Sequence, residues 1–152
     1  MEIKIDDLSS RDVIELLKEH LSDMYATSPP ESVHALDLRA LKAPNITFFS
    51  AWEHREILGC VALKRLDSGH VELKSMRTAR NFRNRGVAKS LLNHVISNAH
   101  DLGYSKMSLE TGTQDFFGPA RKLYEAFGFR YCDPFSDYKL NVNSCFMTRN
   151  LK

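Results

Sequence analysis

The chain has 152 residues, of which 43% are hydrophobic and 26% charged, and its formal net charge at pH 7 is +2. This length and composition fit one globular domain spanning 1–152 and exclude a largely disordered chain. No apolar run approaches the ~20 residues of a membrane-spanning helix, and the N-terminal segment MEIKIDDLSS lacks the apolar centre of a signal peptide, so we expect a cytoplasmic protein without a membrane partner.

The cysteine and histidine patterns predict no metal site. Cys60, Cys132 and Cys145 are far apart, odd in number and without metal-ligand spacing. We therefore expect free thiols in a reducing compartment. The six histidines form no HExxH or similar pattern.

The first third of the chain is expected to hold a strand and two helices. Isoleucines alternate with charged residues over 2–6, which predicts a half-exposed strand. Ser9 or Ser10 can cap a helix whose apolar face is formed by residues at helical spacing: Val13, Leu16, Leu17, Leu21 and Met24. The Pro-Pro pair at 29–30 ends this helix because proline cannot continue the hydrogen-bond ladder. A second, short helix is expected over 32–41.

A meander of three antiparallel strands is expected next, because aromatic and β-branched segments alternate with polar turns. Its strands cover 46–52, 57–66 and the segment from His70. After a basic loop, apolar residues recur at three- and four-residue steps from Val87, which predicts an amphipathic helix. The remaining expected elements are a strand at 105–110, a helix at 117–127 ended by Gly128, and strands at 129–131 and 144–148.

The stretch 71–102 concentrates positive charge before its helix. It has no acidic residue between Glu72 and Asp101, but it carries six cations: Lys74, Arg77, Arg80, Arg83, Arg85 and Lys89. A helix start exposes unpaired backbone N–H groups and carries about half a positive charge, and Gly86 lets a bulky anion approach them. The stretch therefore predicts a phosphate-binding turn, with a solvated basic loop as the alternative.

Two segments resemble signatures of the GCN5-related N-acetyltransferases, the GNAT superfamily. Residues 83–88, RNRGVA, match the Gln/Arg-x-x-Gly-x-Gly/Ala pattern at a strand-to-helix junction, and residues 123–129, LYEAFGF, match the end of the family's fourth helix. The resemblance covers nearly the whole chain in element order and is strongest over 72–129. It implies an α/β sandwich with a mixed, mostly antiparallel sheet of about seven strands flanked by about four helices.

The resemblance also implies acetyl-coenzyme A as cosubstrate, with no metal. Its pyrophosphate would rest on the amides of six consecutive residues: Arg83, Asn84, Arg85, Gly86, Val87 and Ala88. The backbones of Met76 and Thr78 would pair with the pantetheine arm, and the side chains of Arg80 and Arg83 would add positive charge. The chain departs from the family at Phe117, where many members have a cofactor-contacting asparagine.

The same resemblance assigns the residues that move protons. Tyr124 matches the family's usual acid for the departing thiolate, although its spacing from Ala120 and Phe127 also fits a core tyrosine. Glu72 is the first candidate for the base, acting directly or through water, and Glu110 is its rival. Either glutamate could instead be a structural carboxylate satisfied by Arg77 or by loop amides.

The acceptor pocket of this fold lies between the first two helices and the loop before the last strand. The residues expected there are Ser28, Glu31, His34 and Arg39, with Phe135 and Tyr138 as apolar walls. Arg77 could hold a carboxylate, which would favour an amino-acid-like acceptor.

The leading functional hypothesis is transfer of an acetyl group to a primary amine of a small molecule or a protein. The alternative is a catalytically silent acyl-CoA sensor that uses the same phosphate-binding turn. Nucleic-acid binding is disfavoured because the total charge is balanced and Phe82 is the one aromatic residue in the basic run. Homodimers are common in the family, which leaves a second copy open as a partner.

Overall fold

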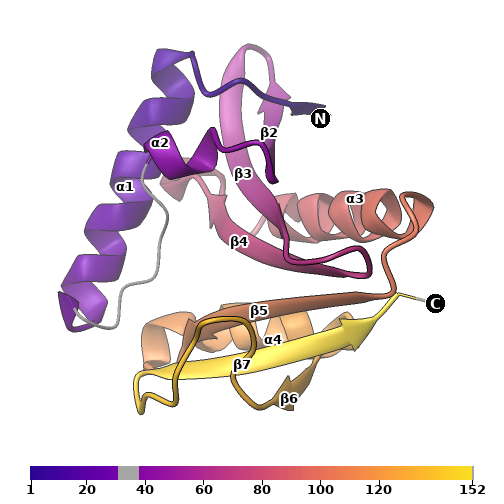
Figure 1. The fold of residues 1–152 in the computed structure, drawn as a ribbon. Helices are drawn as coiled ribbons and strands as arrows, with labels where there is room; N and C mark the ends of the chain where they lie inside the picture. The colour runs from indigo at the N-terminus through magenta and orange to yellow at the C-terminus, as the bar shows by residue number, and fades with distance from the viewer. Residues whose placement is uncertain (31–37, 152) are drawn as a thin grey trace.

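A seven-stranded sheet forms the centre of the structure, a computed structural model that describes residues 1–30 and 38–151 (Figure 1). The strands lie in the order β1-β2-β3-β4-β5-β7-β6. Their bounds are β1 Glu2–Ile5, β2 Ile46–Glu53, β3 Glu56–Arg65, β4 His70–Thr78, β5 Lys106–Gly112, β6 Arg130–Cys132 and β7 Ser144–Asn150. All neighbours pair antiparallel except β4 and β5, which are parallel. The predicted mixed, mostly antiparallel sheet is confirmed.

Helices cover both faces of this sheet. Their bounds are α1 Arg11–Thr27, α2 Leu38–Leu41, α3 Val87–Asp101 and α4 Gly118–Ala126, with short 3₁₀ turns at Arg80–Phe82 and Asp115–Phe117. Of the second helix expected over 32–41, only the end at α2 lies within the described residues. Across the described ranges, no helix combines the length and apolar character needed to cross a bilayer.

Local signals in the sequence begin α1 and end α4 where they were expected. The side chain of Ser10 accepts a hydrogen bond from the backbone N–H of Val13 at 3.2 Å, which caps α1. Gly128, with φ +86°, follows the end of α4 in the left-handed conformation that glycine adopts at low cost.

The apolar core has two parts, one on each face of the sheet. Under α1 and α2 lie buried residues that include Val13, Leu16 and Phe48. The larger part lies under α3 and α4 and includes Leu91, Met107 and Met147, none of which is accessible to solvent. The three cysteines are free, as expected, and burial raises the pKa of the Cys60 thiol to about 12.

Two irregularities in β4 shape the molecule. Cys60 of β3 pairs with Arg77 and Ala62 pairs with Lys74, so β4 carries one extra residue there, and Ser75 has φ +54°. On the other side of β4, pairing with β5 covers His70–Leu73 against Lys106–Leu109. Beyond that point the two strands diverge, as the gap between their ribbons shows in Figure 1.

The packing of α3 on the sheet makes a measurable stability prediction. Leu91 is fully buried, so Leu91→Ala leaves a cavity and should lower the free energy of unfolding by about 2–5 kcal/mol. Leu102, at the end of α3, is 69% exposed, and Leu102→Ala should change stability by less than about 0.5 kcal/mol. Urea unfolding measures both, and equal effects would contradict the position of α3.

Candidate functional site

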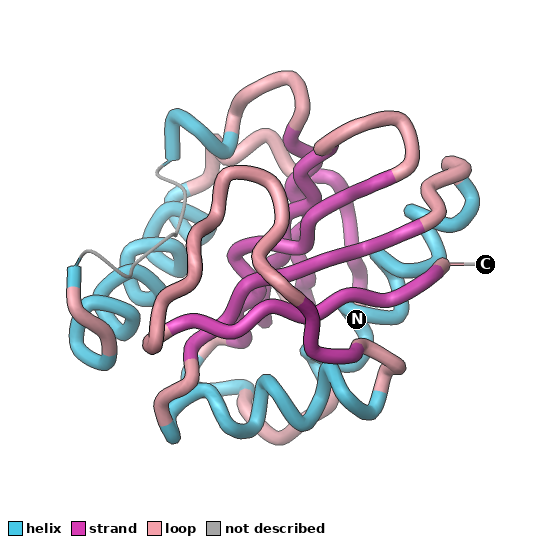
Figure 2. The backbone as a smooth tube through the Cα atoms, turned by 60° about the horizontal axis from the view of Figure 1, so that its bottom comes forward, coloured by secondary structure: helices cyan, strands magenta, loops and turns pink. Residues whose placement is uncertain are grey.

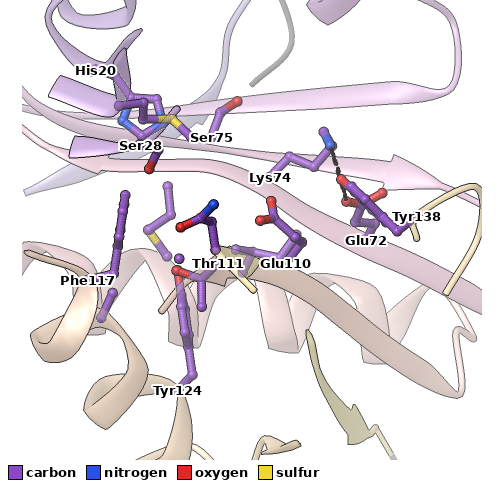
Figure 3. A pocket seen from close by; sticks show the side chains of 16 residues that line it. His20, Ser28, Glu72, Lys74, Ser75, Glu110, Thr111, Phe117, Tyr124 and Tyr138 are labelled. Atoms are coloured by element: carbon purple, nitrogen blue, oxygen red, sulfur yellow. Dashed lines mark hydrogen bonds and ion pairs between the residues drawn. The ribbon is translucent and has the colours of Figure 1, made fainter. Parts of the chain in front are cut away.

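The divergence of β4 and β5 opens two adjoining cavities. The first, here called the inner pocket, lies between the strands and includes Glu72, Lys74, Glu110, Tyr138 and Asn143 in its lining (Figure 3). The second, here called the helix-start cleft, runs from Met76 to the start of α3 and to α4. The residues that line both cavities, and so define their junction, are His20, Met76, Phe117, Ala120 and Tyr124.

The helix-start cleft brings together most of the residues predicted to bind the cofactor: Met76, Thr78, Arg83, Asn84, Gly86, Val87 and Ala88. Gly86 precedes α3 with φ +78° and ψ +13°, and no described side chain caps the helix there. A Cβ built on Gly86 would meet no described atom within 4 Å. The start of α3 therefore lines a cleft with room beside Gly86, which suits an anion at a helix N-terminus.

Two predicted cofactor residues lie elsewhere in the described part of the chain. Arg85 is not in the lining of the helix-start cleft, and its guanidinium lies 5.4 Å from the centre of the Phe82 ring. Arg80 is likewise outside that lining, and its Nη2 lies 2.6 Å from a carboxylate oxygen of Asp23 on α1.

Three arginines of the β4–α3 segment meet two carboxylates of α1. Buried Arg77 reaches Glu19 at 2.8 Å through Nη2 and Asp23 at 2.7 Å through Nη1. Arg80 contacts the same two acids, and Arg83 lies 3.7 Å from Asp23. Partial burial alone would raise the pKa of Asp23, but hydrogen bonds from Arg80 and Arg77 outweigh it and lower that pKa.

The expected role of Arg77 in holding a substrate carboxylate is not supported by this geometry. In a regular strand, Lys74 and Arg77 would point to opposite faces. The extra residue in β4 brings Arg77 onto the face that α1 covers, opposite Cys60. Its guanidinium is then occupied by carboxylates of the protein itself.

Glu72 lies at the wall of the inner pocket and is almost fully buried. Its Oε2 accepts a hydrogen bond from the Tyr138 hydroxyl at 2.7 Å and one from Lys74 Nζ at 3.2 Å, and Lys74 also donates to the Tyr138 hydroxyl at 2.7 Å (Figure 3). The pKa of Tyr138 is raised by burial, by the charge and hydrogen bond of Glu72, and by the charge of Glu110. The partners of Glu72 are therefore Lys74 and Tyr138, where the sequence had suggested Arg77 or loop amides.

Tyr138 belongs to the loop between β6 and β7, and Figure 2 shows this loop running across the sheet. Phe135 packs edge-on against Tyr138 and against Phe146 of β7, and its ring lies 5.8 Å from that of His70. Tyr138 lines the inner pocket, as expected. Phe135 is not among the described residues of that lining, and its ring packs against that of Tyr138.

Glu110 and Tyr124 approach the inner pocket from β5 and α4. Figure 3 shows the carboxylate of Glu110 and the hydroxyl of Tyr124 both pointing into the space beneath β4. The Tyr124 ring packs edge-on against Phe129, so the residue is at once part of the core and part of the pocket wall. Burial raises the pKa of Tyr124, which keeps its hydroxyl protonated.

Sequence reasoning missed His20 and underrated Phe117. His20, on α1, lies at the junction of the two cavities. Burial and the charge of Arg77 lower the pKa of His20 to about 4, although the charges of Asp23 and Glu19 act in the opposite direction. No metal or catalytic motif surrounds His20, so only the position of α1 reveals it. Phe117 lies at the same junction. Its ring fits there because residue 112 is a glycine: a Cβ on Gly112 would lie 2.2 Å from the Phe117 ring.

Of the remaining residues expected at the acceptor site, one lines the inner pocket, one does not, and two lie outside the described residues. Ser28 lines the inner pocket. Arg39 lies on α2 and is not among the described residues of that lining. Glu31 and His34 lie outside the described residues.

Comparison with known proteins identifies the family. The family model described as the acetyltransferase (GNAT) family matches residues 12–129. The chain belongs to the GNAT family. Its relatives include two bacterial proteins named as uncharacterized N-acetyltransferases. YsnE of Bacillus subtilis (strain 168) is 56% identical over 151 residues, 99% of this chain and 100% of that protein. YedL of Escherichia coli (strain K12) is 48% identical over 149 residues, 98% of this chain and 94% of that protein.

Solved structures of GNAT proteins have the same fold. A GNAT-family acetyltransferase from Staphylococcus aureus Mu50 is 28% identical, with a TM-score of 0.72 over 99% of this chain and 100% of that chain. A GNAT acetyltransferase from Elizabethkingia anophelis, solved with acetyl-CoA bound, is 21% identical, with a TM-score of 0.69 over 98% of this chain and 97% of that one. This GNAT chain is an acetyl-transferring enzyme.

The ion pairs between α1 and Arg77 predict a stability effect that depends on pH. Asp23→Asn removes carboxylate contacts to a buried guanidinium and should lower the free energy of unfolding at pH 7 by about 1–3 kcal/mol. Because the folded pKa of Asp23 is lowered, its contribution is present above the unfolded pKa of about 3.9 and is lost as pH falls through the folded pKa. The difference from wild type should therefore shrink below about pH 4.

Glu15 provides the matched control for this measurement. It sits on the same helix, but its pair with Lys18 is exposed and 4.0 Å long. Glu15→Gln should change the free energy of unfolding by less than about 0.5 kcal/mol. Equal effects of the two variants in urea unfolding at pH 7 would refute a stabilising role of the α1 carboxylates.

Proposed function

We propose that this GNAT protein moves an acetyl group from acetyl-CoA directly to a primary amine of a small molecule or protein. The observation that carries the proposal is the divergence of β4 and β5 beside the uncapped start of α3. The uncapped start of α3, the edge of β4 beyond its pairing with β5, and the pocket lined by Glu110 and Tyr124 lie in two adjoining cavities, which supports the proposal.

The helix-start cleft suits the pyrophosphate and pantetheine parts of acetyl-CoA. Gly86 leaves room for a diphosphate against the first amides of α3, where the helix dipole favours negative charge. Arg83 and Lys89 line the same cleft and would add charge. Beyond Leu73, the edge of β4 that faces β5 is not taken up by the pairing between those strands, so the backbone near Met76 and Thr78 is suited to bind the amides of pantetheine.

The acceptor has to lose a proton before it can attack. For an amine with a pKa of ~10.4, forming the neutral species at pH 7 costs about 4.6 kcal/mol. We assign Glu110 as the base because its carboxylate points from β5 into the inner pocket. Glu72 instead positions Tyr138 and Lys74 in the pocket wall.

Tyr124 is suited to protonate the departing thiolate of coenzyme A. It lies at the junction where the sulfur must pass from the helix-start cleft to the inner pocket. Its raised pKa keeps the proton available until the thiolate forms. This role accounts for a tyrosine whose ring is buried and whose hydroxyl points into the pocket.

Thiol release from acetyl-CoA with a panel of amines tests the proposal. Tyr124→Phe keeps the ring packing and removes the acid, so kcat should fall by about 10²-fold or more while the Kd for CoA changes less than about threefold. The control is Tyr131→Phe, because Tyr131 is exposed and hydrogen-bonds to Glu125, away from both cavities. Full turnover by Tyr124→Phe would refute its assignment as the acid. A wild-type protein that binds CoA but releases no thiol would favour the silent sensor.

The two glutamates can be separated by their glutamine variants. Glu110→Gln should lower kcat/KM by about 10²–10⁴-fold. Its residual rate should rise about tenfold per pH unit below the pKa of the amine, because only amine that is already neutral can react. Glu72→Gln should mainly lower stability, since it weakens the contacts to Lys74 and Tyr138. The opposite pattern of rates would make Glu72 the base.

A further inference from the structure

His20 is a polar group at the reaction centre that the proposed mechanism leaves unused. Of the residues that line both cavities, Met76, Phe117 and Ala120 are apolar, so His20 and Tyr124 supply the polar side-chain atoms at the junction. Figure 3 shows them on opposite sides of the space, with His20 above and Tyr124 below. Any thioester that passes through the junction would lie between them.

The imidazole of His20 is held in place by its helix, and its own polar atoms stay available. Its neighbour Glu19, with Asp23 one turn further on, ties α1 to Arg77 of β4. Within residues 1–30 and 38–151, no side chain or backbone group forms a hydrogen bond or ion pair with the ring of His20. Its lowered pKa keeps the ring neutral at physiological pH, with one nitrogen as donor and the other as acceptor.

The direction from which His20 approaches decides which substrate it meets. The helix-start cleft receives its lining mainly from β4, α3 and α4. His20 instead comes from α1, and it lines the inner pocket together with Met24 and Ser28 of the same segment. An amine that occupies the inner pocket would therefore meet the ring of His20 there, beside Met24 and Ser28.

We propose that His20 contacts the acceptor and orients it for attack, an inference that rests on the proposed acetyl transfer. The unprotonated ring nitrogen accepts a hydrogen bond from an N–H of the amine and so directs the amine's lone pair at the carbonyl carbon. Glu110 first takes a proton from the ammonium form of the acceptor. As the N–C bond forms and the C–S bond breaks, Tyr124 protonates the sulfur, and the tyrosinate recovers the second proton that the nitrogen loses. His20 keeps its own protonation state throughout and acts by orientation.

The test measures kcat, KM and CoA affinity for His20→Ala and His20→Gln with the best amine of the panel. His20→Ala should lower kcat by about 10- to 100-fold and leave the Kd for CoA within about threefold of wild type. His20→Gln should recover at least about threefold of the lost kcat, because its side-chain oxygen can accept the same hydrogen bond. The matched control is His100→Ala, since His100 is an exposed histidine of α3.

Each other result overturns the inference. A kcat for His20→Ala within about twofold of wild type means that His20 does not orient the amine. A loss of CoA affinity that matches the loss of kcat, or a glutamine variant no better than alanine, assigns His20 a structural role only. Wild-type protein that releases no thiol overturns the proposed function and this inference together, whereas an active wild type with an active His20→Ala overturns this inference alone.

Discussion

The parting of β4 from β5 after Leu73 and Leu109 is the constraint on which the rest of the site depends. Two parallel strands that stayed paired would satisfy each other's backbone groups and leave no room between them. Here β4 continues to pair with β3 as far as Thr78, while β5 remains paired with β7 as far as Gly112. The sheet thus remains continuous on both sides of the opening, and the cavities are bounded by strands that are well supported elsewhere.

The extra residue in β4 links this opening to α1. It brings Arg77 and Lys74 onto the same face, where Arg77 pairs with acids of α1 and Lys74 with Glu72. A buried guanidinium is costly unless carboxylates compensate it, so α1 is held in one position relative to β4. That position also fixes His20 at the junction of the cavities.

Sequence patterns predicted the strands, the helices and the basic turn because each has a local signal: alternation, helical periodicity, capping residues and the RNRGVA motif. They could not predict which charged groups pair, because Arg77 and Asp23 meet only in the folded chain and one extra residue in a strand leaves no trace in composition. The sequence did not single out His20 either, because its position at the cavities arises only in the folded chain and a lone histidine on an amphipathic helix has no distinguishing pattern. Glu72 was recognised as important, but its partners lie on β4 itself and on a distant loop.

The face of the sheet under the β6–β7 loop is polar, and its hydrogen bonds explain how the fold tolerates this. His70 Nε2 lies 2.6 Å from the Ser108 hydroxyl, which lies 2.9 Å from that of Thr148, so a row of polar groups crosses β4, β5 and β7. Unsatisfied, each such group would cost about 1–3 kcal/mol when buried. Neighbours across the strands satisfy one another in this way, and the ring of Phe135 from the loop packs against His70 at the end of the row. A polar face of this kind is therefore compatible with stability, and the inner pocket beside it is lined by the charged side chains of Glu72, Lys74 and Glu110.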